Sequence, residues 1–311
     1  ILEDTVYVAG LYNTITAANP DGTIKWQFRE NPAGQGVMAG PNVGPDGNIY
    51  VVTDLGGLGA FALSPQGQLL WNIPGFESYG GLGGEIMFGP PGQFYFAESP
   101  LWTTSLLWGI RLDGQIRFSY DIHLGGSGPA VGPDGTVYIG WSSASQSHHL
   151  EALYPNGVLK WALYGLNMNN HLSTPDVGPD GIVYLVGNLS FLHAVNPDGS
   201  IRWEYFENSS LGSPIVSPRN DLVLMGGAEN TGYPYPTFIK AVSTDGRLLW
   251  TVDLPYENGV YISTLAWPRF TPDGRPAYVG TTGNNYAEDI YCYLYAIDTS
   301  IPRVPATPHR R

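Results

Sequence analysis

STPDVGPDGIVYLVGNLSFLHAVNPDGSIRWEYF, residues 173–206, is the stretch that decides the fold. Its short apolar runs, rich in Val, Ile, Tyr and Phe, predict strands and not helices. Pro-Asp-Gly follows the first run and the third run, at 179–181 and 197–199. Pro presets φ, Asp bonds the local backbone and Gly accepts positive φ, so we expect two tight hairpins in a four-stranded antiparallel sheet. The four expected strands are Thr174–Val177, Ile182–Val186, Phe191–Val195 and Ile201–Phe206.

The same unit recurs along the chain. A sheet of four short strands has two apolar faces and needs a copy of itself on either side. Three markers give seven copies in one register, and neighbouring fourth-strand markers lie from 42 residues (Trp161 to Trp203) to 47 residues (Trp71 to Phe118) apart. The fourth strand carries Trp26, Trp71, Phe118, Trp161, Trp203 and Trp250. The second carries Tyr7, Tyr50, Tyr95, Tyr138, Tyr184, Leu224 and Tyr278, and the third carries Ala17, Ala62, Gly109, Ala152, Ala194, Ala241 and Ala296.

Four strands repeated at this spacing predict an all-β fold, a seven-bladed β-propeller of four-stranded antiparallel blades. Stacked sheets lie about 10 Å apart, so we expect each large indole to face a small third-strand residue across that gap. The repeats predict a single propeller domain over residues 1–300 and a Pro-rich tail over residues 301–311.

The repeat resembles that of a known superfamily. The order Pro-Asp-Gly, Val-Tyr, Ala-Val-Asn-Pro-Asp-Gly and Ile-Arg-Trp is similar to the pyrroloquinoline-quinone-like repeat of the quinoprotein-dehydrogenase-like superfamily, over roughly Thr5 to Asp298. The resemblance implies a propeller, and the superfamily includes periplasmic assembly scaffolds as well as enzymes. Its dehydrogenases are much longer and hold calcium, typically with adjacent cysteines beside the quinone. The single Cys292 therefore favours the non-enzymatic branch.

Composition limits the partners. The net charge is −13 and only three residues are lysine, so the chain is unsuited to a phosphate backbone and we expect no nucleic acid. No run of 18 apolar residues predicts a membrane span. The lone Cys292 excludes an internal disulfide and a cysteine metal cluster. Numbering begins at Ile1 and not at Met, which fits a removed secretory signal, so we expect a secreted protein, extracellular or periplasmic.

The two ends of the chain are incomplete copies of the unit. The first copy begins at Thr5 with its second strand, and the seventh has three strands, at 269–271, 277–280 and 291–298. An open sheet edge invites pairing with other chains. We expect the tail either to supply the inner strand of the first blade or to contact a neighbouring subunit. The candidate contact residues are Pro302, Val304, Pro305 and Pro308.

Long loops are expected on one face only. The Pro-Asp-Gly turns belong to one face of a propeller, so the long connections gather on the other, and long loops on a rigid scaffold often carry binding residues. Large aromatic residues there suit a protein contact or stacking on sugar rings, and we take them as the candidate partner-binding face. The simpler alternative is that they only cover the blades. These residues are Tyr79, Trp102, Trp141, Tyr233, Tyr235, Tyr256, Trp267 and Tyr286.

No metal site is predicted. His148 and His149 are adjacent at the start of a strand and point to opposite sides, so they cannot easily bind one ion. One loop offers hard oxygens suited to calcium, but we expect it to be a solvated acidic loop: Asn284, Asn285, Glu288 and Asp289. Turn roles explain the repeated aspartates, which we expect to be structural: Asp21, Asp46, Asp134, Asp180, Asp198, Asp245 and Asp273.

No nucleophile elbow, phosphate loop or zinc signature occurs, and His193, inside a strand, is expected to be a packed histidine. We therefore expect no catalytic residues and no cofactor. The preferred function is a non-catalytic structural or protein-interaction subunit, associating with copies of itself as an oligomer or filament. The alternatives are a carbohydrate- or peptide-binding module that uses the aromatic loops, and an enzyme built around the central channel, such as a lyase, hydrolase or quinone oxidoreductase.

Overall fold

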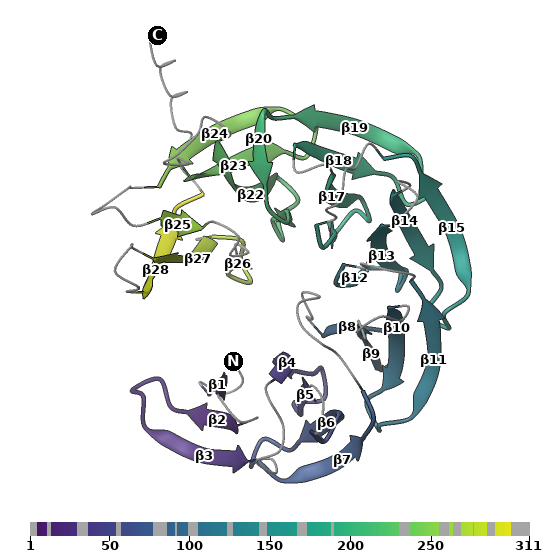
Figure 1. Ribbon diagram of the computed structural model, residues 1–311, viewed down its shortest axis with the longest axis vertical. Coiled ribbons are helices and arrows are strands. Elements are labelled where there is room, and N and C mark those ends of the chain that lie inside the picture. The colour runs from purple at the N-terminus through teal and green to yellow at the C-terminus, as the bar shows by residue number, and fades with distance from the viewer. Residues whose placement is uncertain are drawn as a thin grey trace. The chain divides into compact units, whose positions relative to one another are not determined.

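The computed structural model describes most of the chain. The described residues are 5–10, 14–29, 37–53, 57–76, 86–90, 92–98, 105–122, 127–142, 148–166, 173–187, 190–229, 237–254, 261–263, 269–275, 277–284 and 290–299. They contain strands and turns but no helix, and none of them forms a helix that could cross a membrane. The fold is a seven-bladed β-propeller of small antiparallel sheets, which confirms the predicted fold class (Figure 1).

Blades 1 to 4 follow one another along the chain, each with its strands in sequence order. Blade 1 contains β1 (Val6–Gly10), β2 (Thr14–Ala18) and β3 (Ile24–Arg29), and blade 2 contains β4 (Val37–Val43), β5 (Ile49–Thr53), β6 (Ala60–Leu63) and β7 (Leu69–Ile73). Blade 3 contains β8 (Met87–Gly89), β9 (Gln93–Glu98), β10 (Leu106–Arg111) and β11 (Ile116–Asp121), and blade 4 contains β12 (Ala130–Val131), β13 (Val137–Ser142), β14 (His148–Leu153) and β15 (Leu159–Tyr164).

Blades 5 to 7 complete the described sheets. Blade 5 contains β16 (Asp176–Val177), β17 (Val183–Gly187), β18 (Phe191–Val195) and β19 (Ile201–Phe206), close to the four strands expected from the sequence. Blade 6 contains β20 (Ser209–Leu211), β21 (Ile215–Val216), β22 (Leu222–Glu229), β23 (Thr237–Ser243) and β24 (Leu248–Asp253), with β20 and β21 both pairing β22. Blade 7 contains β25 (Tyr261–Ser263), β26 (Arg269–Phe270), β27 (Ala277–Asn284) and β28 (Ile290–Ile297).

The chain forms two compact units. One comprises residues 1–131, 135–145 and 151–160, and the other comprises residues 132–134, 146–150 and 161–311. In the described residues the two terminal blades are the narrow ones, because blade 1 has three strands, as expected, and in blade 7 both β25 and β26 pair with β27. Among the same residues no strand follows β28 in blade 7. The tail residues Pro302, Val304, Pro305 and Pro308 lie outside the described part of the chain, so the closure of the propeller stays a prediction.

The turns within the blades follow the Pro-Asp-Gly chemistry. In blade 5, Gly181 has a φ of 82° and Gly199 a φ of 88°, in the left-handed region that favours glycine. The Oδ1 atom of Asp198 accepts a hydrogen bond from the Ser200 backbone N–H at 3.0 Å, and Asp180 does the same for Ile182 at 3.1 Å. These aspartates stabilise their own turns and are not gathered at a metal site.

The three sequence markers form one row across each blade. In blade 5 Tyr184 pairs with Ala194, which pairs with Trp203, and the two rings have centroids 5.9 Å apart over the small residue between them. In blade 3 an added Cβ at Gly109 would lie 2.3 Å from the Phe118 ring. The small residue therefore makes room for rings of its own sheet. The predicted contact of this residue with an indole of the stacked sheet is wrong, because the pairing register cannot be read from the pattern alone.

Each outer-strand aromatic ring then packs against the next blade. Trp203 Nε1 donates to the Thr244 carbonyl at 3.0 Å, and the ring lies 3.0 Å from the Cβ position of Gly246. A turn glycine without a side chain thus provides a flat surface, and a carbonyl two residues before it accepts the indole proton. The same pair of contacts joins Trp26 to Pro65 and Gly67, Trp71 to Leu112 and Gly114, and Trp161 to Pro197 and Gly199.

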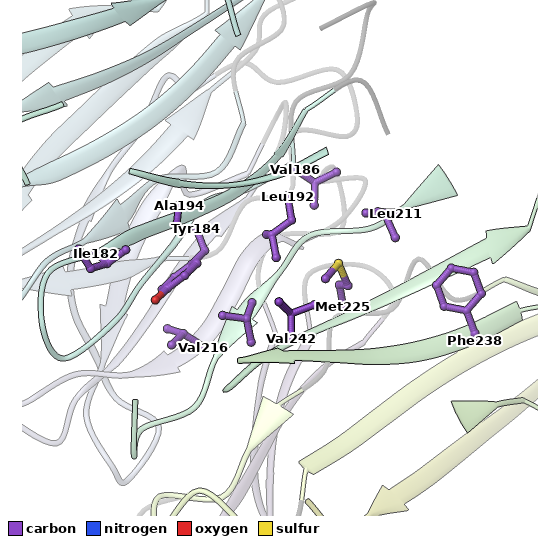
Figure 2. Close-up of a cluster of buried hydrophobic side chains, with 11 residues drawn as sticks. Ile182, Tyr184, Val186, Leu192, Ala194, Leu211, Val216, Met225, Phe238 and Val242 are labelled. Atoms are coloured by element: carbon purple, nitrogen blue, oxygen red, sulfur yellow. The ribbon is translucent and has the colours of Figure 1, made fainter. Parts of the chain in front are cut away.

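Buried aliphatic and aromatic side chains fill the space between consecutive sheets. Figure 2 shows one such cluster, in which side chains from blade 5 meet side chains from blade 6. Alternate residues of a strand point to opposite faces, so each blade supplies one set of side chains to each neighbour. The cluster contains Ile182, Tyr184, Val186, Leu192, Ala194, Leu211, Val216, Val223, Met225, Phe238 and Val242.

We predict that Gly67→Ala destabilises the protein much more than Gly22→Ala. Both glycines have positive φ, 80° for Gly67 and 87° for Gly22. Backbone strain should therefore lower the free energy of unfolding of each alanine variant by about 1–2 kcal/mol. The Cβ position of Gly67 lies 2.7 Å from the Trp26 ring, whereas no atom lies within 4 Å of that of Gly22. Overpacking should add about 1–3 kcal/mol at Gly67 alone. Urea unfolding of both variants measures the difference, and equal losses would show that ring packing on the glycine contributes nothing.

Candidate interaction surface

The outer strand of each of the first six blades is the last strand of its sheet. Its first residue is aliphatic in all six blades and is between 42% and 60% exposed. A single exposed aliphatic residue is ordinary, but the same position exposed in six blades is a repeated surface feature. We call this set the outer-strand row: Ile24, Leu69, Ile116, Leu159, Ile201 and Leu248.

A bulge follows the first residue of these strands. In blade 5 Trp203 pairs with Ala194 but Ile201 pairs with Val195, so Arg202 is the extra residue. The same shift makes Lys25 the extra residue in blade 1 and Arg117 the extra residue in blade 3. A bulge strengthens the local twist and disrupts pairing along an edge. The outer-strand row therefore stands beside an irregular, often basic backbone position in a chain of net charge −13.

Two of the basic residues at this position hold their own blade together. Lys25 Nζ donates to Thr5 Oγ1 at 2.6 Å, and Lys160 Nζ donates to Thr136 Oγ1 at 3.0 Å. Each ties an outer strand to the beginning of the second strand. Arg117 and Arg202 are exposed, and we assign them to the surface beside the outer-strand row.

Exposed aromatic residues lie at the far ends of two outer strands. Phe206, the last residue of β19, is 58% exposed, and its ring centroid lies 4.8 Å from that of Phe191 in the neighbouring strand. Tyr164, the last residue of β15, is 63% exposed. The sequence analysis missed both because each sits inside an expected strand. The sequence did contain a signal for Phe206. Trp203 and Tyr205 fall on one face of the strand, and Phe206 falls on the opposite face.

Most of the aromatic residues expected on the loop face lie outside the described residues: Tyr79, Trp102, Tyr233, Tyr235, Tyr256, Trp267 and Tyr286. Trp141 is described. It belongs to β13 and not to a loop, and its side chain is 7% exposed within a core cluster with Ile139 and Leu153. Its ring thus packs in the core between blades 3 and 4. A partner-binding loop face remains a prediction.

A polar network lies at the loop-facing end of blades 5 and 6. Lys240 in β23 forms an ion pair with Glu207, which directly follows β19, and both side chains are largely buried. Tyr205 donates to the same Glu207 Oε2 at 2.9 Å, and burial together with this bond raises the pKa of the Tyr205 hydroxyl. The Lys240 ammonium also lies 4.4 Å from the Phe238 ring centroid. Because each charge has its counter-charge, neither is left unpaired at this sheet interface, and the network needs no ligand.

Asp176 in β16 links the inner strands of blades 5 and 6. One carboxylate oxygen accepts from the Val177 N–H at 2.9 Å and the other from the Val216 N–H at 2.8 Å. Burial raises the pKa of Asp176 to about 6, although both N–H donors act to lower it. Because both carboxylate oxygens accept hydrogen bonds from the backbone, Asp176 has a structural role.

His193 is packed, as expected from its place in a strand. It is 1% exposed in β18, and its Nδ1 lies 2.9 Å from Glu204 Oε1 across the strand pair. Burial lowers the pKa of His193, and Glu204 partly opposes this. His148 and His149 are in β14. In the described residues no three His, Cys, Asp or Glu side chains gather to hold a metal ion, and of the expected acidic loop only Asn284 is described, in β27.

Comparison with known proteins gives the fold and no family. No protein-family model matches the chain, and no curated protein matches it. Among solved structures it is similar to BamB from Moraxella catarrhalis, with a TM-score of 0.62 and 17% identity over 98% of this chain and 88% of that chain. The C-terminal WD40 domain of Sif2 gives a TM-score of 0.66 at 13% identity, covering 96% and 84%.

The Dos1 propeller is also similar, with a TM-score of 0.63 and 10% identity over 97% of this chain and 78% of that chain. Identities this low establish the shared propeller fold alone. Propellers serve many unrelated functions, so the function must be argued from this chain's own surface.

We predict that Asp176 makes stability decrease as the pH rises from 5 to 7. Its folded pKa of about 6 lies above the ordinary 3.8, so the folded state holds the proton more tightly. This contribution is complete at low pH and is lost as the pH rises through 6. Between pH 5 and pH 7 the free energy of unfolding of the wild type should fall by about 1 kcal/mol more than that of Asp176→Asn.

Thermal unfolding at pH 5, 6 and 7 measures this difference, with Asp198→Asn as the matched control. The pKa of Asp198 is lowered by its turn partners, so it is ionised throughout the range. Identical slopes for the wild type and Asp176→Asn would show that the buried carboxylate does not hold a proton.

We predict that Lys240→Ala destabilises the protein by about 3 kcal/mol, because it leaves Glu207 largely buried without its counter-charge. The control is Arg111→Ala, which breaks the exposed Arg111–Asp113 pair and should change stability by less than about 1 kcal/mol. Urea unfolding measures both. A second variant, Lys240→Ala with Glu207→Gln, should recover part of the loss, and no recovery would contradict the electrostatic explanation.

Proposed function

We propose that this chain is a non-catalytic β-propeller that works as a structural or protein-interaction subunit and associates with copies of itself. The observation that carries the proposal is the outer-strand row, an aliphatic residue left exposed at one position of six blades. An exposed aliphatic residue at the same position of successive blades offers apolar side chains for a contact between copies. Association of identical chains through such a surface gives an oligomer, or a filament where the contact is head to tail.

We infer further that the chain belongs to the non-enzymatic branch of the quinoprotein-dehydrogenase-like superfamily and is secreted, extracellular or periplasmic. The repeat sequence supports both points, since the superfamily that it resembles includes periplasmic assembly scaffolds. Three buried or largely buried ionisable side chains in the described residues have structural partners. Lys240 pairs with Glu207, Glu151 accepts from Tyr120, and Asp176 bonds two backbone donors. This supports a non-catalytic role without a cofactor.

Binding of carbohydrate or peptide is the second candidate. Phe206, backed by Phe191, presents an exposed ring, and an exposed aromatic face is the usual platform for a sugar ring or an apolar side chain. The two candidates differ in where they place the contact. Self-association uses the aliphatic beginnings of the outer strands, whereas a sugar or peptide would use the aromatic end of β19.

Sedimentation velocity over a range of concentrations tests the first candidate. We expect the wild type to show a concentration-dependent rise in sedimentation coefficient, and electron microscopy to show rings or filaments. The double variant Ile24→Lys with Ile116→Lys should remain monomeric, because a charge cannot be buried in an apolar contact. Its melting temperature should stay close to that of the wild type, since both side chains are exposed.

The matched control is Gln27→Lys with Ser119→Lys. It adds the same charge to the same two strands, at exposed positions outside the outer-strand row. The control should associate like the wild type. A wild type that stays monomeric at all concentrations would contradict self-association, and equal effects of the two double variants would show that the row is not the contact.

A further inference from the structure

We propose that Asn208 is an acceptor for an N-linked oligosaccharide and that Phe206 stacks on its first sugar. This rests on the proposed secretion, since the donor is found in the secretory route. Asn208-Ser209-Ser210 has the Asn-X-Ser order that N-glycosylation requires, with Phe206 two residues before the asparagine. Such triplets also arise by chance, so the argument depends on how the fold presents this one.

The residue before the acceptor is held firmly. Glu207 forms an ion pair with Lys240, accepts a hydrogen bond from Tyr205, and donates its backbone N–H to the Ser190 carbonyl at 2.8 Å. These contacts fix both the side chain and the backbone of Glu207 at the end of β19. The backbone of Asn208 therefore follows a residue whose position is fixed.

The residue after the acceptor is equally constrained. Ser209 is buried at the beginning of β20, where it pairs with Glu229, and its N–H donates to the Glu207 carbonyl at 2.8 Å. This bond from residue i+2 to residue i closes a three-residue turn with Asn208 at its tip. Asn208 is exposed while both neighbours are pinned. The turn thus presents the Asn208 side chain to solvent between two constrained neighbours.

Phe206 supplies the second, independent observation. Its ring is 58% exposed at the end of β19 and rests against Phe191 at a centroid distance of 4.8 Å. A large aromatic ring that Phe191 supports on one side and that is more than half exposed offers an apolar surface to solvent. Sugar rings carry an apolar face of C–H groups that packs on the negative face of an aromatic ring. A sugar attached two residues later would cover this ring.

The chemistry is a transfer from a lipid diphosphate oligosaccharide. The Asn208 side-chain amide nitrogen bonds to C1 of the first sugar and gives up one proton, and the bond between C1 and the phosphate oxygen breaks. The lipid diphosphate leaves with the bonding electrons, and a base of the transferase takes the proton. No electrons are gained or lost overall, and the host enzyme supplies the donor.

The test is secretion of the full chain from a eukaryotic cell line, followed by intact mass measurement before and after peptide N-glycosidase treatment. We expect the enzyme to remove one oligosaccharide and to leave an aspartate at position 208 in the peptide map. Asn208→Gln and Ser210→Ala should both lose this oligosaccharide. Asn72→Gln, outside any Asn-X-Ser triplet, should keep it, and similar melting temperatures would show that all variants fold.

Phe206→Ser tests the stacking. In the wild type the glycosylated form should melt about 1–2 °C above the enzymatically trimmed form, whereas in Phe206→Ser this difference should vanish. Absence of any oligosaccharide, or its persistence in Asn208→Gln, overturns the acceptor assignment. The latter result would place the sugar on Asn188, the other Asn-X-Ser asparagine, which lies outside the described residues. These readouts are independent of self-association, so either proposal can fail while the other holds.

Discussion

The structure depends on one repeated contact, an aromatic ring of an outer strand laid on the turn glycine of the following blade. The ring needs a turn without a Cβ beneath it and a carbonyl placed to accept its N–H, as between Trp203, Gly246 and Thr244. Both requirements fall on the turn between the third and fourth strands, so the contact ties the position of that turn to the preceding blade. The small residue under the ring has the same origin, because Ala194 must leave space for both Trp203 and Tyr184. The order of the marker residues within each unit follows from these steric demands, while the spacing between the outer-strand rings varies from 42 to 47 residues.

The position beside this row is free to vary, and the blades use it differently. The residue just before the small residue is Phe61 in blade 2 but Glu151, His193 and Lys240 in blades 4, 5 and 6. Each polar side chain there has a partner: Glu151 accepts from Tyr120, His193 lies beside Glu204, and Lys240 pairs with Glu207. A sheet interface thus tolerates a charge when a complementary group comes with it. The fold is therefore set by the aromatic row, while the neighbouring position distinguishes one blade from another.

Sequence patterns predicted what depends on local chemistry. The turns around Gly181 and Gly199, the four strands of blade 5 and the seven-fold repeat all follow from short-range rules. Register and exposure did not follow, because they depend on which residue lies across the sheet. The pattern predicts an indole of the stacked sheet opposite Ala194, but the indole beside it, Trp203, belongs to its own sheet. The pattern also places Trp141 in a loop, although it packs in the core between blades 3 and 4. The pattern gives Phe206 as an ordinary strand residue, since periodicity does not reveal how exposed the side chain at a strand end is. The surface features are thus the part of the site that only the structure supplies.

An exposed outer strand in each of the first six blades raises a question of aggregation, since a sheet edge invites pairing with another chain. The bulge in the outer strand reduces this risk locally. At Lys25, Arg117 and Arg202 the extra residue disrupts the regular ladder and carries a positive charge, which opposes continuous pairing along the edge. The aliphatic residue next to it is still accessible, so side chains rather than backbone groups are available for contact. A surface built in this way favours specific side-chain association over open-ended strand addition. The opposite end of β19 has no bulge, and there Phe206 is left as the exposed apolar group.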